Sequence, residues 1–167
     1  MLGLPVFLGL LIGNAAAIDV GLNYPNGGSV NCVGLAANTC CSIGGSSDSP
    51  FGSVTFKYIP TDWKVAGSAH RGPACGAIWD SQFSNGRTTF TLSNGWFGGA
   101  GFHFGSVKRS EPFFTDSARP NVVGLADGTR YNVTNWDDAS FNAMVCILSS
   151  YYYLDNIRLG TCTNLIL

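Results

Sequence analysis

The chain has 167 residues, a formal net charge of -1, 46% hydrophobic residues and only 11% charged residues. This balance excludes a disordered acidic or basic tail and a nucleic-acid binder that depends on Lys and Arg. The length suits one domain with a real core, and no second domain is expected.

The first 17 residues read as a signal peptide. An apolar run, LGLPVFLGLLIG, is followed by the small residues Ala15, Ala16 and Ala17. Small residues of this kind suit signal peptidase, which predicts cleavage before Ile18, and the apolar run is too short to span a bilayer. The competing interpretations are a first core strand or a membrane anchor. The sequence therefore predicts a signal peptide over 1–17 and one secreted domain over 18–167, with no membrane span.

Residues 18–50 read as loops. The pairs Asn26-Gly27 and Gly44-Gly45 and a Ser/Asp/Pro stretch surround the first three cysteines. We expect disulfides, rather than strand pairing, to order this segment. From Ser53 to Ile59 polar and apolar residues alternate, which predicts a half-buried strand with Val54, Phe56 and Tyr58 on one face, ended by Pro60.

The clearest local prediction is a hairpin. Residues 77–83 and 88–92 flank Ser84-Asn85-Gly86-Arg87, and Asn-Gly readily adopts the positive φ angles of a tight turn. A second turn is expected at Asn94-Gly95. The GGAGFHFG segment after it predicts a glycine-rich strand that backbones or aromatic rings approach closely.

The last third predicts a turn, a short strand, a helix and a final strand. Asp127-Gly128 marks the turn before residues 130–133. Phe141, Met144, Val145 and Leu148 recur at helical spacing, and Asp137 and Asp138 are placed to cap that helix rather than to act as a catalytic pair. YYYLDNIRLG is read as the last strand. The fold class expected is mainly β (α+β), a compact disulfide-stapled antiparallel sheet or sandwich with one helix near the C-terminus.

Six cysteines follow the predicted cleavage point, an even number that favours three disulfides in an oxidising compartment. They are Cys32, Cys40, Cys41, Cys75, Cys146 and Cys162. A zinc site would need paired or clustered Cys and His, so no metal or other cofactor is predicted. Adjacent cysteines point opposite ways in an extended segment and should have different partners. Of the fifteen pairings we favour the shortest loops, Cys32 with Cys40, Cys41 with Cys75, and Cys146 with Cys162.

One glycosylation sequon is present at Asn132-Val133-Thr134. A secreted chain is expected to carry an N-linked glycan there if the loop is exposed.

Four segments together resemble a known group of proteins. They are CVGLAANTCCSI, SVTFKYIPTDWKVAGSAHRGPACG, NGRTTFTLSNGWFGGAGFHFG and DGTRYNVTNWDDASFNAM. In this order they are similar to uncharacterised small secreted cysteine-rich proteins of mushroom-forming fungi. The resemblance implies a fungal source and secretion, and it transfers no catalytic residue.

Catalytic constellations are sparse. One Glu and nine Asp, mostly beside turns or caps, are a thin supply for a glycosidase, and GxSxG is absent. Copper monooxygenases that act on polysaccharides use an N-terminal His, but the predicted mature residue is Ile18. His70 and His103 are the weak candidates for a ribonuclease-like hydrolase, helped by Arg71, Arg87 or Glu111. The competing interpretation places His70 in a polar loop and packs His103 between two Phe on a strand.

Aromatic residues offer a binding alternative. If exposed in one plane they would stack on sugar rings, although Trp and Tyr are ordinarily core residues. The candidates are Trp63, Trp79, Trp96, Trp136 and the run Tyr151, Tyr152 and Tyr153. We therefore expect a secreted, non-enzymatic, effector-like or cell-surface interaction protein whose partner is an extracellular protein or glycan. A carbohydrate-binding module is the second interpretation and a small hydrolase the third.

Overall fold

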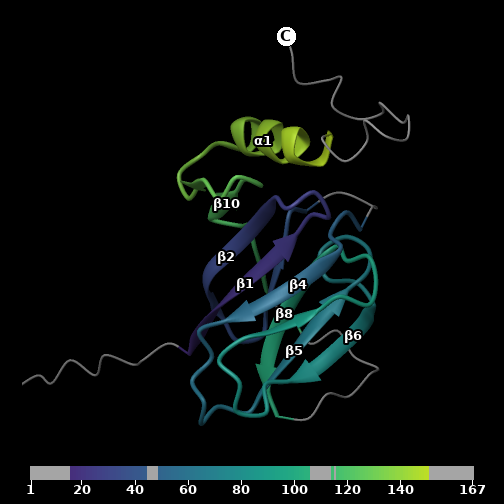
Figure 1. Cartoon of the computed structure of the whole chain (residues 1–167), viewed down its shortest axis with the longest axis vertical. Helices are drawn as coiled ribbons and strands as arrows, with labels where there is room; N and C mark the ends of the chain where they lie inside the picture. Colours follow the sequence, from purple (N-terminus) through teal and green to yellow (C-terminus); the bar gives the residue numbers. More distant parts are fainter. Residues whose placement is uncertain (1–15, 45–48, 106–113, 115, 151–167) are drawn as a thin grey trace, which may run out of the picture.

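The computed structural model describes residues 16–44, 49–105, 114 and 116–150, and these form two packed β-sheets and one helix (Figure 1). The strands are β1 Ala17–Asn23, β2 Ser29–Ala36, β3 Thr39–Ser42, β4 Ser53–Lys57, β5 Val65–His70, β6 Ile78–Phe83, β7 Phe90–Leu92, β8 Gly99–Phe104, β9 Asp116–Ala118, β10 Val122–Gly124 and β11 Arg130–Asn132. The helix α1 spans Asp138–Ser150. Among the described residues, no helix is long and apolar enough to cross a membrane.

Strand order defines the two layers. Sheet A runs β11-β10-β2-β1-β4-β7, and sheet B runs β6-β5-β8-β3-β9. All pairings are antiparallel except the parallel pairing of β3 with β9. The expected fold class, a mainly antiparallel disulfide-stapled sandwich with one C-terminal helix, is confirmed.

The core lies between the sheets. Alternate residues of each strand point inward, as the two-residue period of a strand requires. From sheet A come Val20, Leu22, Val54 and Phe56, and from sheet B come Val65 and Phe102 among others, all fully buried. Gly67 on β5 leaves room for the rings of Phe56 and Phe90, because a Cβ there would lie 2.7 Å from the tip of Phe90.

The loop prediction for residues 18–50 is wrong. β1 lies in the interior of sheet A, paired with β2 on one side and β4 on the other. The alternation of Ile18, Val20 and Leu22 is the signal of a half-buried strand, and Asn26-Gly27, which suggested a loop, lies in the tight turn between β1 and β2.

The strand prediction for 53–59 holds except at its end. Val54 and Phe56 face the core, but Tyr58 is 71% exposed and adopts a φ of 60°. The chain therefore leaves the strand after Lys57, and Ile59 takes the inward position that the alternation assigned to Tyr58.

The predicted hairpin around Asn85-Gly86 is also wrong. The turn itself forms, with positive φ at both residues and a bond from the Arg87 amide to the Ser84 carbonyl oxygen. However, β6 belongs to sheet B and β7 to sheet A, so the turn is a corner between the two layers.

The predictions of the glycine-rich strand, of the Asp127-Gly128 turn with the strand after it, and of the helix are confirmed. β8 is the glycine-rich strand, and a Cβ on Gly101 would lie 2.5 Å from the ring of Phe114. β10 and β11 flank the Asp127-Gly128 turn. α1 buries Phe141 and Leu148, with Met144 and Val145 packed against the core. The predicted final strand lies outside the described residues.

Two disulfides leave β3 from its opposite faces and join it to other parts of the chain. Cys41 points into the sandwich and bonds Cys32 of sheet A, whereas Cys40 points outward and bonds Cys75 in the loop after β5. The predicted pairings Cys32 with Cys40 and Cys41 with Cys75 are therefore wrong. The expectation that the two adjacent cysteines have different partners is confirmed. Cys146 is also disulfide-bonded. Its predicted partner, Cys162, lies outside the described residues.

Candidate functional site

The two histidines are buried rather than gathered in a cleft. His70 is the last residue of β5 and 1% exposed, so its predicted place in a polar loop is wrong. His103 is buried on β8. In the β5–β8 register His70 lies opposite Gly99 and His103 lies opposite Ala66, four positions apart along the strands. The two rings therefore do not form an accessible acid–base pair.

His70 connects β5 to the loop that follows it. Its Nδ1 lies 2.8 Å from the Gly76 carbonyl oxygen and its Nε2 lies 3.0 Å from the Ser68 hydroxyl. Because a carbonyl oxygen only accepts, Nδ1 carries the hydrogen and Nε2 accepts from Ser68. Burial lowers the pKa of His70, and the nearby His103 lowers it further, while the bond to Gly76 acts in the opposite direction.

The other residues of the hydrolase hypothesis do not join the histidines. Arg87 donates to the carbonyl oxygens of Ser84 and Phe83. Arg71 is exposed and stacks on an indole, as described below. Glu111 lies outside the described residues.

The four candidate tryptophans divide into two packed and two exposed residues. Trp63 meets Phe104 edge to face and packs on the core, and Trp136 also packs on the core. Trp79 is 51% exposed and Trp96 is 43% exposed. Tyr151, Tyr152 and Tyr153 lie outside the described residues.

We give the name tryptophan site to Trp79, to Arg71 stacked on it, and to the exposed Trp96, which lies two residues after Asn94. Trp79 lies on β6, the edge strand of sheet B, and its Nε1 donates to the Asn94 carbonyl oxygen at 2.9 Å. A Cβ on Gly95 would lie 2.6 Å from this nitrogen, so only glycine lets the residues before Trp96 approach the indole so closely. The Arg71 guanidinium carbon lies 3.1 Å from the centre of the Trp79 ring.

A shallow groove borders this site. It runs where β6, an edge of sheet B, meets β7, an edge of sheet A, and we call it the edge groove. Its lining is Asp80, Ser81, Gln82, Thr91, Leu92, Ser93 and Asn94. Trp79 precedes Asp80 in the chain and donates to Asn94, so it stands at the end of the groove. The groove can offer hydroxyl, amide and carboxylate groups to a polar ligand.

Sequence reasoning named Trp79 and Trp96 but missed the edge groove. The hairpin prediction included a strand over residues 77–83, yet only the assignment of β6 and β7 to different sheets brings their polar side chains to one edge. No local sequence signal specifies that assignment.

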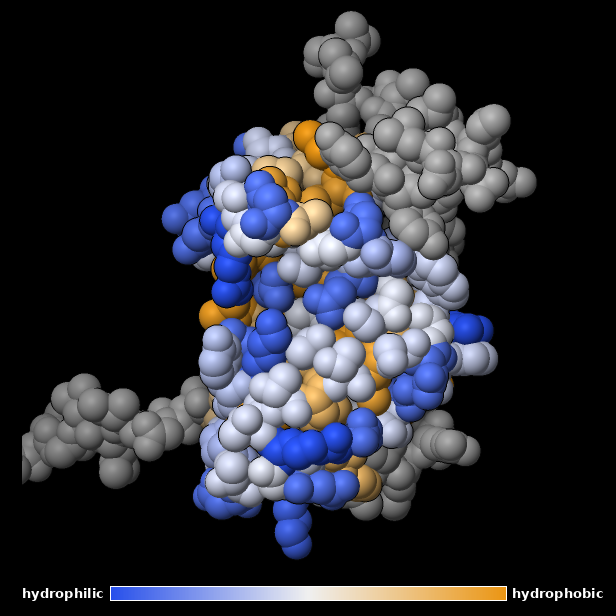
Figure 2. All heavy atoms as spheres, in the orientation of Figure 1, coloured by the Kyte–Doolittle hydropathy of each residue, from blue (hydrophilic) through white to orange (hydrophobic). Residues whose placement is uncertain are grey.

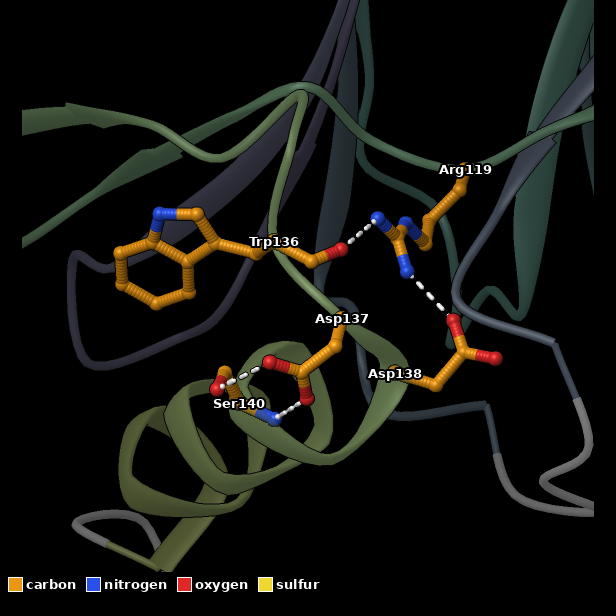
Figure 3. A network of polar contacts seen from close by, with 5 residues as sticks. All are labelled: Arg119, Trp136, Asp137, Asp138 and Ser140. Atoms are coloured by element: carbon orange, nitrogen blue, oxygen red, sulfur yellow. Dashed lines mark hydrogen bonds and ion pairs between the residues drawn. The ribbon is translucent and has the colours of Figure 1, made fainter.

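A second cluster of polar groups fixes the start of α1 (Figure 3). The guanidinium of Arg119 lies 2.5 Å from an Asp138 carboxylate oxygen and 2.6 Å from the Trp136 carbonyl oxygen, and it also lies over the Phe141 ring. The Trp136 indole points away from Arg119 in this view. The cluster holds the helix against the sandwich.

Asp137 caps α1, as predicted. Its two carboxylate oxygens accept hydrogen bonds from the Ser140 amide and hydroxyl. The bond from the Ser140 amide holds the pKa of Asp137 below its usual value. Asp137 and Asp138 thus have structural partners, and neither faces the other as an acid–base pair would.

The sequon residue Asn132 is exposed at the end of β11, an edge strand. Its Oδ1 accepts bonds from the Thr134 amide at 3.0 Å and from the Thr134 hydroxyl at 2.7 Å. The side chain is therefore accessible, as glycosylation requires.

No group of three or more His, Cys, Asp or Glu placed to hold a metal ion occurs among the described residues. On the face drawn in Figure 2, hydrophobic residues reach the surface in small patches, mostly at the end where α1 lies, with polar residues between them.

A family model, ARB_05566_N, described as an N-terminal domain, matches residues 20–121. The chain belongs to this family. The tryptophan site, the edge groove and both described disulfides lie inside the ARB_05566_N match, whereas β10, β11 and α1 lie beyond it. No curated protein and no solved structure matches the chain.

Proposed function

We propose that this protein is a secreted, non-enzymatic binding domain that recognises carbohydrate through the tryptophan site and the edge groove. The observation that carries the proposal is the exposed indole of Trp79 at the end of a polar groove, with the exposed Trp96 two residues after Asn94 of the groove lining. A sugar ring has an apolar C–H face and a rim of hydroxyls. An indole ring can pack against the apolar face, and the polar side chains of the groove can form hydrogen bonds with the hydroxyls.

Secretion and a fungal source are part of this proposal. The apolar and small residues before Ile18 support export, and disulfide-bonded cysteines suit an oxidising compartment. The resemblance to small secreted proteins of mushroom-forming fungi supports the source. An extracellular position would bring the domain to cell-wall glycans.

A binding role accounts for the residues better than hydrolysis does. The hydrolase hypothesis needs His70 or His103 beside the substrate, and both are buried. Both imidazole rings are buried within sheet B, and the ring of His70 also donates a hydrogen bond that holds the loop after β5. A protein ligand remains the competing extracellular partner, and the experiment below distinguishes it.

The test is a pull-down with insoluble cellulose, chitin, β-1,3-glucan and pectin, followed by affinity electrophoresis in the soluble forms. Trp79→Ala and Trp96→Ala should each weaken binding about tenfold, because one lost stacking ring is worth about 1.4 kcal/mol. Tyr131→Ala is the matched control, since Tyr131 is an exposed aromatic residue on β11 of the other sheet.

Binding that survives in both tryptophan variants would contradict the assignment of the site. Absence of binding to the whole panel, from a folded protein, would contradict a carbohydrate ligand and leave the protein partner as the better hypothesis.

A further inference from the structure

Arg71 differs from Arg87 and Arg119 in the contacts of its side chain. Arg87 and Arg119 use their donors on carbonyl or carboxylate oxygens of the chain. Within the described residues, the exposed Arg71 side chain makes no hydrogen bond or ion pair, and its recorded contact is the stack on Trp79. The guanidinium is therefore held in place while its N–H groups stay available to a ligand.

The loop that carries Arg71 is fixed by several independent contacts. The Arg71 amide donates to the Ala77 carbonyl oxygen, and Cys75 is bonded to Cys40 of β3. The Gly76 carbonyl oxygen accepts from His70.

The backbone of this loop has unusual φ angles and packs tightly against the segment before β8. Ala74 and Cys75 adopt φ angles of 46° and 53°, which non-glycine residues rarely do. A Cβ on Gly98 would collide with the Gly72 carbonyl oxygen, so the segment before β8 supports the loop at contact distance. A position fixed in this way lets a ligand bind Arg71 at a small entropic cost.

Stacking leaves part of Trp79 open as well. The guanidinium covers one face of the indole, yet the residue remains 51% exposed. The pair thus presents an aromatic surface and a cation side by side at the end of the edge groove.

We infer that the glycan bound at the tryptophan site carries carboxylates, as a uronic acid polymer does, and that Arg71 binds one of them. This rests on the proposed function and names its ligand class. A guanidinium matches a carboxylate with two parallel N–H···O bonds. With a net charge of -1 and one such cation, the site suits a single carboxylate better than a run of phosphates.

The edge groove fits the rest of such a ligand. Asp80 accepts a bond from the Ser81 amide through one carboxylate oxygen, so its other oxygen can accept from a sugar hydroxyl. Gln82, Thr91 and Ser93 add uncharged donors and acceptors. We therefore assign the ligand carboxylate to Arg71 and the ligand hydroxyls to the edge groove.

The test compares oligogalacturonate with its full methyl ester by calorimetry, since the ester keeps the ring and removes the charge. Wild-type protein should bind the acid at least tenfold more tightly than the ester, and added salt should reduce this ratio. Arg71→Gln should bind the acid and the ester with equal affinity. Arg130→Gln, which removes an exposed charge on β11, should keep the wild-type ratio.

Equal affinity of the wild-type protein for acid and ester would overturn the inference, and so would an unchanged ratio in Arg71→Gln. The wild-type comparison needs no variant, so misfolding of Arg71→Gln would not remove the test. If the protein binds the ester or a neutral glycan through its tryptophans and shows no preference for the acid, this inference is refuted and the proposed function stands. Binding to neither galacturonate ligand also overturns it, and absence of binding to the whole polysaccharide panel overturns the proposed function too.

Discussion

The imidazole of His70 donates to the carbonyl oxygen of Gly76, so a buried strand residue holds the backbone of the exposed loop that carries Arg71. This bond, together with the bond from Ser68 to Nε2, requires the neutral form of the ring.

Stability should therefore fall when the solution becomes mildly acidic. The pKa of His70 is lowered from 6.5 in the folded protein, so the unfolded chain binds the proton more tightly. The contribution of His70 is full above pH 6.5 and is lost as pH falls from there toward the lowered folded pKa. Thermal unfolding at pH 8, 6.5 and 5 should show a falling midpoint.

His70→Gln serves as the comparison, because its amide can replace both hydrogen bonds but cannot titrate. Its midpoint should change less between pH 8 and 5 than that of the wild type. The stabilising contribution of Asp137, whose pKa is lowered, is full above about pH 4 and is lost only below it, so it does not change between pH 8 and 5. Parallel pH profiles for the two proteins would contradict the role of His70.

The disulfide assignment can be tested by paired alanine variants. Cys40→Ala/Cys75→Ala should leave no free thiol, whereas Cys32→Ala/Cys40→Ala should leave two cysteines without their native partners. Thiol titration of the denatured, unreduced proteins distinguishes the cases. The opposite result would restore the pairing expected from loop length alone.

Removal of either bridge should reduce the free energy of unfolding, and the loss of Cys40–Cys75 should reduce it more. The 35-residue separation of Cys40 and Cys75 corresponds to about 4 kcal/mol, and the 9-residue separation of Cys32 and Cys41 to about 3 kcal/mol. Denaturant unfolding of the two paired variants measures the difference. Only the loss of Cys40–Cys75 should also weaken ligand binding, because that bridge holds the Arg71 loop.

Arg119 should matter more to the docking of α1 than its ion pair suggests. Asp138 is 90% exposed in its side chain, and exposed ion pairs contribute little, so Asp138→Asn should cost less than about 0.5 kcal/mol. Arg119→Ala also removes the bond to the Trp136 carbonyl oxygen and the contact with Phe141, and it should cost about 1 to 2 kcal/mol.

Hydrogen exchange can localise that loss. In Arg119→Ala the amides of Asp138–Ser150 should exchange faster while those of β5 and β8 stay unchanged. Arg130→Ala, on the surface of β11, is the control. Equal effects of Asp138→Asn and Arg119→Ala would show that the ion pair dominates instead.

Asn132 should carry a glycan when the chain is secreted by a eukaryotic host. Its side chain is exposed, and Thr134 already contacts its amide oxygen through both the backbone and the hydroxyl. Mass spectrometry of the secreted protein before and after glycosidase treatment tests this. Asn132→Gln and Thr134→Ala should remove the glycan, and Thr134→Ser should keep it. An unmodified Asn132 in exported wild-type protein would contradict the prediction.

Several local elements after residue 50 could be predicted from the sequence, whereas their assembly into two sheets could not. Phe141 and Leu148 specify a helix face, and Asn85-Gly86 specifies a turn, because both signals depend on neighbouring residues. Beyond the turn, however, the Thr88 carbonyl oxygen accepts from Ile59, at the end of β4, and the chain continues into sheet A. Which sheet a strand joins depends on distant strands, which a local pattern does not contain.

The candidate site shows the same division. Trp79 and Trp96 could be named from residue type, but their exposure depends on β6 being an edge strand. The interpretation that competes with catalysis places His70 in a polar loop before Pro73 and Cys75, and this placement is wrong. Burial of His70 comes from the pairing of β5 with β6 and β8, and that pairing depends on residues far along the chain.

The disulfide partners of the two adjacent cysteines in β3 depend on the register of that strand against β8. A slip of β3 by one residue along β8 would turn every side chain to the other face. Cys40 would then face Cys32 and Cys41 would face Cys75, with each sulfur displaced along the strand from its present partner. In the observed register, both bridges can close at once on opposite faces of one strand. A bridge closed with its present partner is therefore compatible only with the observed register of β3.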